Sequence, residues 1–390
     1  MQTGLERLLN DPRHWLGKGR VGLVANPTTV DRRFQHAIDL LHAHPDVNLA
    51  LLLGPEHGIR GSAQDMILVG DTRDEVTGLP EVSLYGRTFE SLTPRAADLA
   101  RIDILVFDIQ DVGARYYTYA ATMALCMQAA AKAGVKVVVL DRPNPIGGLQ
   151  VEGGGLEPGL ENFCALYPVP QRHGMTVGEL ARLYNSGFGI GCELEVVACE
   201  GWRRSEYYDE TGLPWVMPSP NMPTLETAVV YPGLCLLEAT NLSEGRGTTR
   251  PFELFGAPFI DGRALAAELG GYGIEGAILR PCFMEPTFHK HAKKSCGALQ
   301  IHVTERPLFD AYRLGLAICT AVRKLWPTEF AWRTEEYEFR DDVPAIDLLT
   351  GKPAVREAID AGRPFDDIVR LAAGGTEVYD TGRDAALLYD

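Results

Sequence analysis

The chain has 390 residues, of which 46% are hydrophobic and 23% are charged, so it can bury a sizeable core and is expected to form two domains. Its formal net charge of −15 comes from 37 Lys and Arg against 52 Asp and Glu. A surface this acidic repels phosphate groups, which disfavours nucleic acids and anionic membranes as partners, although a local cluster of arginines can still bind an anion.

Short apolar runs and helical patterns alternate through the first third of the chain. The predicted strands are residues 21–25, 47–53, 82–85, 102–107 and 135–140, and the predicted helices are residues 34–44, 93–101 and 116–133. The run 47–53 is nearly all apolar, as a strand covered on both faces must be. Strands that alternate with helices in this way indicate βαβ units, right-handed crossovers and a parallel sheet.

A stretch rich in glycine and proline, residues 143–170, is predicted to end the first domain. We therefore expect a first domain at residues 1–160 and a second, mixed α/β domain at residues 161–390. Beyond the connection, the pattern predicts strands at 194–198 and 299–304 and helices at 176–185, 262–269, 307–325, 352–361 and 365–373. Residues 225–237 are ambiguous because a proline and a glycine interrupt them.

Polar residues follow each of the four long predicted strands. In an open parallel sheet, ligands bind outside the carboxyl ends of the strands, and neighbouring strands lie about 4.8 Å apart. These side chains therefore converge on one rim of the sheet. They lie on turns that Pro and Gly make stiff, and a loop that is merely solvated does not need that stiffness. The groups at this rim are Asn26, Glu56, His57, Asp108, Asp111, Arg115 and Asp141.

Glu56 is the sharpest catalytic candidate, because Pro55 and Gly58 predict a tight turn that fixes its carboxylate. A carboxyl group at the mouth of an apolar strand is partly desolvated, which raises its pKa toward that of a general acid. The plain alternative is a glutamate that caps the amides of the next loop. Asp108 has two equally supported interpretations. It is either a general base or an acceptor for sugar hydroxyls, or it has a purely structural role. Asp111 is expected to be structural.

Two loops in the later half of the chain add a second cluster. Residues 217–224 form a proline-studded loop that contains Asn221, and residues 239–249 hold Glu244 and Arg246 between glycines. Such a loop can approach a ligand closely and bind a hydroxylated or anionic group. The plain alternative is a surface turn.

Three histidines carry weaker signals. His173 precedes a predicted helix and could reach the cleft, although a structural role is favoured, and His289 and His291 lie among lysines in what we interpret as a solvated basic face. The sequence has no dinucleotide-binding glycine fingerprint, no P-loop and no G-x-S-x-G elbow. We therefore predict no cofactor and no metal.

The eight cysteines are scattered, and none forms a CxxC pair. Several lie in apolar stretches, which fits buried thiols in a reducing compartment better than a disulfide framework. The first residues lack the apolar run of a signal peptide, and no stretch approaches the roughly 18 apolar residues of a membrane span. We therefore expect a cytoplasmic protein, and the sequence is also compatible with a homodimer.

Six motifs occur in an order that resembles a known family. They are Leu53-Gly54-Pro55-Glu56-His57-Gly58, Phe107-Asp108-Ile109-Gln110-Asp111-Val112-Gly113 followed by Arg115-Tyr116-Tyr117-Thr118-Tyr119, Asp141-Arg142-Pro143-Asn144-Pro145, His173-Gly174-Met175-Thr176, Ser219-Pro220-Asn221-Met222-Pro223-Thr224 and Glu244-Gly245-Arg246-Gly247-Thr248. Over roughly residues 20–390 the chain is similar to the exo-β-N-acetylmuramidase family, the NamZ-like enzymes. The resemblance implies a Rossmann-like N-terminal domain, a smaller C-terminal α/β domain, and release of N-acetylmuramic acid from the non-reducing end of peptidoglycan fragments.

The resemblance also implies roles for individual residues. Glu56 is implied to be the catalytic acid and Glu244 to act in the cleft, and the implied lining residues are Asp108, Arg115, Asn221 and Arg246. Many family members carry an export signal, which we expect to be missing from this chain. That difference favours recycling of imported muropeptides, with MurNAc-GlcNAc or a peptide-bearing fragment as the substrate.

The chemistry of the residues fits such a reaction. Glycoside hydrolysis usually needs two carboxyl groups, and Glu56 and Glu244 could face each other across a cleft between domains. Alternatively, the N-acetyl oxygen of the substrate is the second group, with Glu56 or Asp108 as its partner. The lactyl carboxylate of muramic acid needs a local cation, for which the available donors are Arg60, Arg115 and Arg246. The tyrosines at 116, 117 and 119 can stack on the sugar ring.

The predicted site thus comprises two groups of residues. The catalytic residues are Glu56, Glu244 and Asp108, and the substrate-binding residues are Asn26, His57, Arg60, Arg115, Tyr116, Asp141, His173, Asn221, Arg246 and Thr248. Two other functions stay open. One is a metal-assisted ester or phosphate hydrolase with Glu56, His57, Asp108 and Asp141 as ligands, and the other is a non-catalytic sugar sensor that binds muropeptides.

Overall fold

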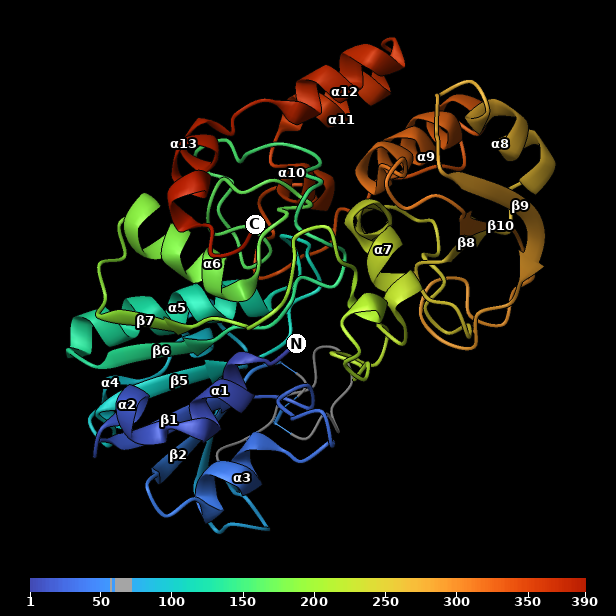
Figure 1. The fold of residues 1–390 in the computed structure, drawn as a ribbon. Helices are drawn as coiled ribbons and strands as arrows, with labels where there is room; N and C mark the ends of the chain where they lie inside the picture. The colour runs from blue at the N-terminus through green and yellow to red at the C-terminus, as the bar shows by residue number, and fades with distance from the viewer. Residues whose placement is uncertain (57, 60–71) are drawn as a thin grey trace.

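The protein is described by a computed structural model that covers residues 1–56, 58–59 and 72–390. It contains a seven-stranded sheet with the strand order β3-β4-β2-β1-β5-β6-β7 and a three-stranded sheet with the order β8-β10-β9 (Figure 1). We call the part built on the larger sheet the N-terminal unit and the part built on the smaller sheet the C-terminal unit. The predicted α/β class is confirmed.

The larger sheet is parallel except at its edge, where β3 runs antiparallel to β4. Its strands are β1 (Arg20–Ala25), β2 (Asn48–Gly54), β3 (Thr72–Arg73), β4 (Pro80–Ser83), β5 (Ile104–Asp108), β6 (Lys136–Leu140) and β7 (Leu194–Val197). Because all the long strands point the same way, the loops after β1, β2, β5 and β6 leave the sheet along one edge.

Helices cover both faces of this sheet. They are α1 (Gly4–Asn10), α2 (Pro12–Leu16), α3 (Ala37–Ala43), α4 (Ala96–Leu99), α5 (Tyr119–Ala133), α6 (Val177–Arg182) and α13 (Glu377–Ala386), with short helical turns η1 (Phe89–Leu92), η2 (Leu183–Gly187) and η3 (Tyr208–Glu210). Along β5, Ile104 and Val106 pack with α1 to α3, whereas Leu105 and Phe107 pack with α4 to α6. This alternation explains why the strands read as continuous apolar runs.

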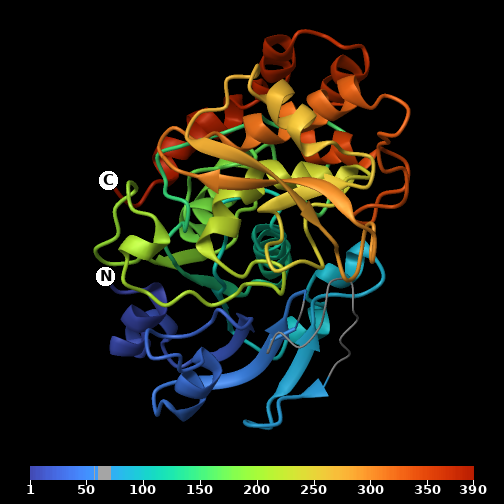
Figure 2. The same cartoon turned by 90° about the vertical axis from the view of Figure 1, so that its right-hand side faces the viewer.

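The two ends of the chain meet at Asp141, just after β6. The backbone N–H of Gly4 donates to the Asp141 carbonyl at 2.8 Å, and the Tyr389 hydroxyl donates to the Asp141 carboxylate. The N–H of Leu388 donates to Glu179 of α6 at 2.9 Å. The N-terminal unit is therefore completed by the last residues of the chain, and both termini lie on the same side of the molecule in Figure 2.

The C-terminal unit combines an antiparallel sheet with helices. Its elements are α7 (Leu225–Leu234), η4 (Cys235–Ala239), β8 (Leu254–Ala257), α8 (Gly262–Leu269), β9 (Ala277–Met284), β10 (Cys296–Val303), α9 (Ala311–Leu325), α10 (Ala345–Thr350), α11 (Pro353–Asp360) and α12 (Phe365–Ala373). The central strand is β10, with β8 and β9 at the edges (Figure 2). The prediction that the second part of the chain mixes helices and strands is confirmed.

The domain boundary predicted at residue 160 lies too early. β7 pairs with β6 along Val137–Leu140, so the larger sheet continues well past that residue. The glycine-rich stretch 143–170 is not a free linker between domains, because it packs against both units. There, Gly154 and Gly155 approach the backbone of residues 372–375 so closely that a Cβ atom at either glycine would clash.

Candidate active site

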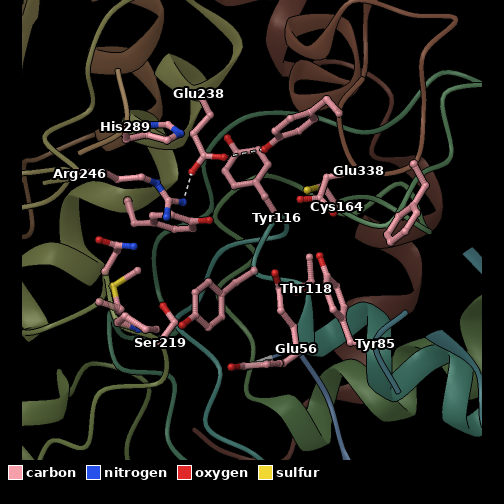
Figure 3. Close-up of a pocket in the computed structure, with 18 of the residues that line it drawn as sticks. Glu56, Tyr85, Tyr116, Thr118, Cys164, Ser219, Glu238, Arg246, His289 and Glu338 are labelled. Atoms are coloured by element: carbon pink, nitrogen blue, oxygen red, sulfur yellow. Dashed lines mark hydrogen bonds and ion pairs between the residues drawn. The ribbon is translucent and has the colours of Figure 1, made fainter. Parts of the chain in front are cut away.

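A cavity of about 440 Å³ lies between the two units, at the carboxyl ends of β2 and β5 (Figure 3). The N-terminal unit contributes Glu56 and residues 116–119 to its walls. The connecting loop contributes residues 219–222, and the C-terminal unit contributes Glu238, Arg246, His289 and parts of residues 333–339. Four predicted site residues, Glu56, Tyr116, Asn221 and Arg246, thus meet in one cavity although they lie far apart in the sequence.

Glu56 is held by the turn that the sequence predicted. Gly58 has a φ of 73°, a conformation that glycine adopts without strain, and its N–H donates to the Pro55 carbonyl at 2.9 Å. The Glu56 side chain is half-buried, and its Oε2 accepts a hydrogen bond of 3.2 Å from the hydroxyl of Thr118, at the start of α5. Figure 3 shows both side chains together at the same wall of the cavity.

Three tyrosines beside Glu56 give the cavity a wall of neutral aromatic rings. The Tyr116 hydroxyl donates to the Pro232 carbonyl at 2.7 Å, and the Tyr119 hydroxyl donates to the Pro218 carbonyl at 2.8 Å. The Tyr117 ring meets Tyr119 edge to face at 5.2 Å between centroids. Burial raises the pKa of all three tyrosines well above the usual value, so they stay uncharged.

The opposite wall carries a network of four charged side chains. Glu244 is fully buried, with Lys290 Nζ at 3.0 Å, Arg246 Nε at 3.2 Å and His289 Nδ1 at 3.3 Å from its oxygens. Arg246 Nη2 also donates to Glu238 Oε1 at 2.8 Å, and the Tyr337 hydroxyl donates to Glu238 Oε2 at 2.9 Å. Although burial raises the pKa of Glu244, Lys290, His289 and Arg246 together hold it well below its usual range.

The expectation that Glu244 faces Glu56 across the cleft is wrong. Glu244 lies behind the cavity wall and stays ionised, because three basic groups surround it. Glu238, six residues earlier in the chain, does line the cavity, as do Glu336 and Glu338. Glu244 therefore acts on the site through Arg246 and His289, which it holds in place.

Asp108 and Arg115 lie outside the cavity lining, in the buried interior. Both oxygens of Asp108 accept hydrogen bonds from the Arg142 guanidinium, at 2.5 and 2.9 Å. The Arg115 guanidinium donates to the carbonyls of Val169 at 2.9 Å and Leu349 at 2.6 Å, which ties the two units together. Removing a charge from water is costly unless the charged group has polar partners. Both side chains have such partners inside the fold, and neither points at a ligand.

Three further predicted binding residues also make internal contacts instead of lining the cavity. Nε2 of His173 lies 3.1 Å from Asp111 Oδ2, and both side chains are buried. The side-chain oxygen of Asn26 accepts the N–H and hydroxyl of Thr28, at 2.9 and 2.6 Å. The Thr248 hydroxyl donates to the Gly245 carbonyl at 2.6 Å. His57 and Arg60 lie outside the residues that the structure describes.

Asp141 also belongs to the interior. Its carboxylate accepts hydrogen bonds from the Thr176 hydroxyl at 2.7 Å and the Gly178 N–H at 2.7 Å, besides the one from Tyr389. Burial raises the pKa of Asp141 from 3.8 to about 6, against these hydrogen bonds, which lower it. Between these two values the folded protein binds more protons than the unfolded chain, so ionisation of Asp141 removes stability as the pH rises.

We therefore expect the Asp141→Asn variant to show a different pH profile of stability. Relative to this variant, the free energy of unfolding of the wild type should fall by about 2 kcal/mol between pH 4 and pH 7, because the asparagine side chain cannot ionise. Urea denaturation of both proteins at several pH values measures the difference. A difference that is constant over this range would contradict the assignment.

Several lining residues carry no signal in the sequence alone. His289 was assigned to a solvated basic face, yet it lines the cavity and contacts Glu244, 45 positions earlier. Glu238 lies just after a run that was ambiguous between helix and loop. The segment 333–339 reaches the cavity because Phe339 packs edge to face on Tyr85 and Phe163 of the N-terminal unit.

Among the described residues, no group of three His, Cys, Asp or Glu side chains has the arrangement of a metal site. Of the four ligands considered for a metal-assisted hydrolase, only Glu56 lines the cavity, Asp108 and Asp141 are engaged elsewhere, and His57 is not described. No helix in the described part of the chain is long and apolar enough to cross a membrane.

Comparison with known proteins agrees with the geometry. Family models for exo-β-N-acetylmuramidase NamZ match residues 21–226 (N-terminal) and 229–389 (C-terminal). The peptidoglycan β-N-acetylmuramidase NamZ of Bacillus subtilis (strain 168) is 43% identical over 389 residues, which cover 100% of this chain and 91% of that protein. Crystal structures of two DUF1343 family proteins of Bacteroides fragilis NCTC 9343 match with TM-scores of 0.90 and 0.77 at 34% and 29% identity, each covering 100% of this chain and 99% of the other. The resemblance carried by the six motifs is confirmed, and the chain belongs to the exo-β-N-acetylmuramidase NamZ family of glycosidases.

Proposed function

We propose that this protein releases N-acetylmuramic acid from the non-reducing end of peptidoglycan-derived fragments, with Glu56 as the general acid. The observation that carries the proposal is the position of Glu56, whose carboxyl group stands on a stiff turn at the wall of a cavity with a hydrogen bond from Thr118. The neutral tyrosines beside it remove water from this wall without adding a charge that would take its proton.

In this reaction, the protonated Glu56 gives its proton to the glycosidic oxygen as the bond to the anomeric carbon breaks. Water adds to that carbon, and the proton that water loses restores the acid. Glycosidases usually place a second carboxylate near the anomeric carbon. Among the described residues of the cavity wall, Glu238 is positioned for that role by Arg246 and Tyr337, and the N-acetyl group of the substrate is the other candidate.

The size of the cavity supports action at the end of a glycan. A volume of about 440 Å³ lies within the range of sites for single small molecules, about 300–1,000 Å³. Such a cavity encloses one sugar and leaves the next sugar at its mouth. A fragment such as MurNAc-GlcNAc, with or without a peptide, fits this arrangement better than the middle of a long glycan strand.

The test compares two chromogenic substrates that differ only in the lactyl group. The wild-type protein is expected to cleave the β-N-acetylmuramide and to leave the matching β-N-acetylglucosaminide largely intact, because the proposed site is built for a sugar acid. Release of the chromophore is measured over time for both. Cleavage of the glucosaminide alone would refute the proposed specificity.

We further propose that the protein works in the cytoplasm on imported fragments. The supporting observation is that all eight cysteines are free thiols, seven of them buried. Disulfides form and persist in oxidising compartments, whereas free thiols are typical of a reducing one. Fractionation of cells that carry the native gene tests this proposal, and activity found only outside the cytoplasm would refute it.

A further inference from the structure

A loop between β9 and β10, residues 286–294, which we call the strap, holds an unusual backbone. Three of its non-glycine residues have left-handed φ values, His289 at 67°, His291 at 56° and Lys293 at 61°. Side-chain-bearing residues avoid this region, and they cluster there at functional sites when the surrounding structure holds them.

The strap is pinned on both sides of His289. The N–H of Thr287 donates to the Gly247 carbonyl at 2.9 Å, and Lys290 Nζ donates to the Leu237 carbonyl at 2.8 Å. The His291 ring contacts the Asn241 carbonyl at 2.6 Å through Nε2. Gly247 must be a glycine here, because a Cβ would lie 2.6 Å from the Phe288 carbonyl. The strap therefore fixes one side chain, His289, at the cavity.

The ring of His289 lines the cavity and has one nitrogen beside Glu244. Its Nδ1 lies 3.3 Å from Oε1 of the fully buried Glu244, and 42% of the side chain is exposed. A carboxylate at Nδ1 selects the tautomer that carries a proton there, which leaves Nε2 for a ligand. In Figure 3, His289 and Glu56 lie at opposite walls with the cavity between them.

The charges of the network around His289 are balanced before a substrate arrives, and Arg333, Glu336 and Glu338 also line the cavity. The groups around His289 are Glu244 and Arg246 from the loop after η4, Glu238 of η4, and Lys290 of the strap itself. Two carboxylates offset two permanent cations. The positive charge of Arg246, predicted from the sequence to meet the substrate, is already shared between Glu238 at 2.8 Å and Glu244 at 3.2 Å.

A substrate with a carboxylate adds one negative charge to this balanced network. His289 lines the cavity beside Glu244, and a histidine with both ring nitrogens protonated can donate to a carboxylate on each side of its ring. We propose that His289, in its protonated form, binds the lactyl carboxylate and so distinguishes N-acetylmuramic acid from N-acetylglucosamine. Glu244 is then a positioning residue. This inference rests on the proposed function.

The test is the His289→Asn variant, assayed with the chromogenic β-N-acetylmuramide. Asparagine tolerates a left-handed backbone and can still donate to Glu244, but it cannot be protonated. We expect KM to rise about 10- to 100-fold, the range for loss of a hydrogen bond to a charged group, while kcat changes less than about threefold.

The matched control is Lys293→Asn, in the same strap and also with a left-handed backbone, but exposed and outside the cavity lining. Its KM should stay at the wild-type value. A collapse of kcat at unchanged KM in His289→Asn would overturn the proposal. Arg87 of the N-terminal unit also lines the cavity, and an increase in KM in Arg87→Gln with none in His289→Asn would likewise overturn it. If the wild type cleaves no muramide, the proposed function fails instead.

Discussion

Replacement of Glu56 by glutamine is expected to lower kcat on a natural muramyl disaccharide by about 10²- to 10⁴-fold, the usual contribution of a general acid. Glutamine has the same shape and can still accept the hydrogen bond from Thr118, so the fold should keep its stability. Steady-state rates and a thermal melt of the same preparation measure the two quantities.

A change of leaving group tests whether Glu56 acts as a proton donor. A nitrophenolate departs without protonation, whereas a sugar hydroxyl needs a proton from the acid. The Glu56→Gln variant should therefore lose much less activity on a nitrophenyl muramide than on the disaccharide. An equal loss on both substrates would assign Glu56 a role other than proton donation.

The control for Glu56→Gln is the same substitution at Glu226. This residue is exposed in the first turn of α7, outside the cavity lining, so Glu226→Gln should leave both rates unchanged. A Glu56→Gln variant with full activity on the disaccharide would remove Glu56 from the mechanism.

The largest effect on stability is expected at Asp108. The Asp108→Ala variant leaves the Arg142 guanidinium buried without its carboxylate, and breaking a buried pair in this way costs about 3–5 kcal/mol. Urea denaturation measures the loss. Activity per folded molecule should change much less than stability, because Asp108 does not line the cavity.

Asp103 provides the matched comparison, five residues earlier and just before the same strand. It also pairs with an arginine through both oxygens, to Arg20 at 2.9 and 3.1 Å, but both side chains are about half exposed. The Asp103→Ala variant should therefore lose far less stability, since water replaces the partner. Equal losses at the two sites, or an inactive Asp108→Ala protein of normal stability, would contradict the structural role of Asp108.

The larger sheet was predictable because its signals are local. A strand covered on both faces must be apolar throughout, and the run predicted at 47–53 is β2, Asn48–Gly54. The strand β9 was not predicted. Pro281 lies inside it, and proline is tolerated there because β9 is an edge strand, which only the completed sheet reveals.

The ambiguous run 225–237 shows how tertiary packing decides a local conflict. Pro232 and Gly233 suggested a break, yet α7 continues through both. A Cβ at Gly233 would lie 1.6 Å from the Ala311 carbonyl, so this glycine permits the close crossing of α7 and α9. The Pro232 carbonyl accepts the Tyr116 hydroxyl. Neither partner is visible in a window of the sequence.

The site was predictable where its geometry depends on one turn, and not where it depends on distant partners. Glu56 is placed by Pro55 and Gly58, its own neighbours. Glu244 also sits in a tight glycine loop, but which way it faces is set by the strap some 45 positions later. Charged residues at strand ends either bind ligands or form ion pairs inside the protein. Asp108 and Glu56 therefore cannot be distinguished in the sequence until their partners are known.

The meeting of both chain ends at Asp141 has a consequence for biosynthesis. A ribosome releases residues in order, and β1 to β6 are made long before Tyr389 and Leu388. Until those last residues arrive, the Asp141 and Glu179 carboxylates lack hydrogen-bond donors that the finished protein gives them. The N-terminal unit therefore lacks these hydrogen bonds until residues 388 and 389 have been synthesised.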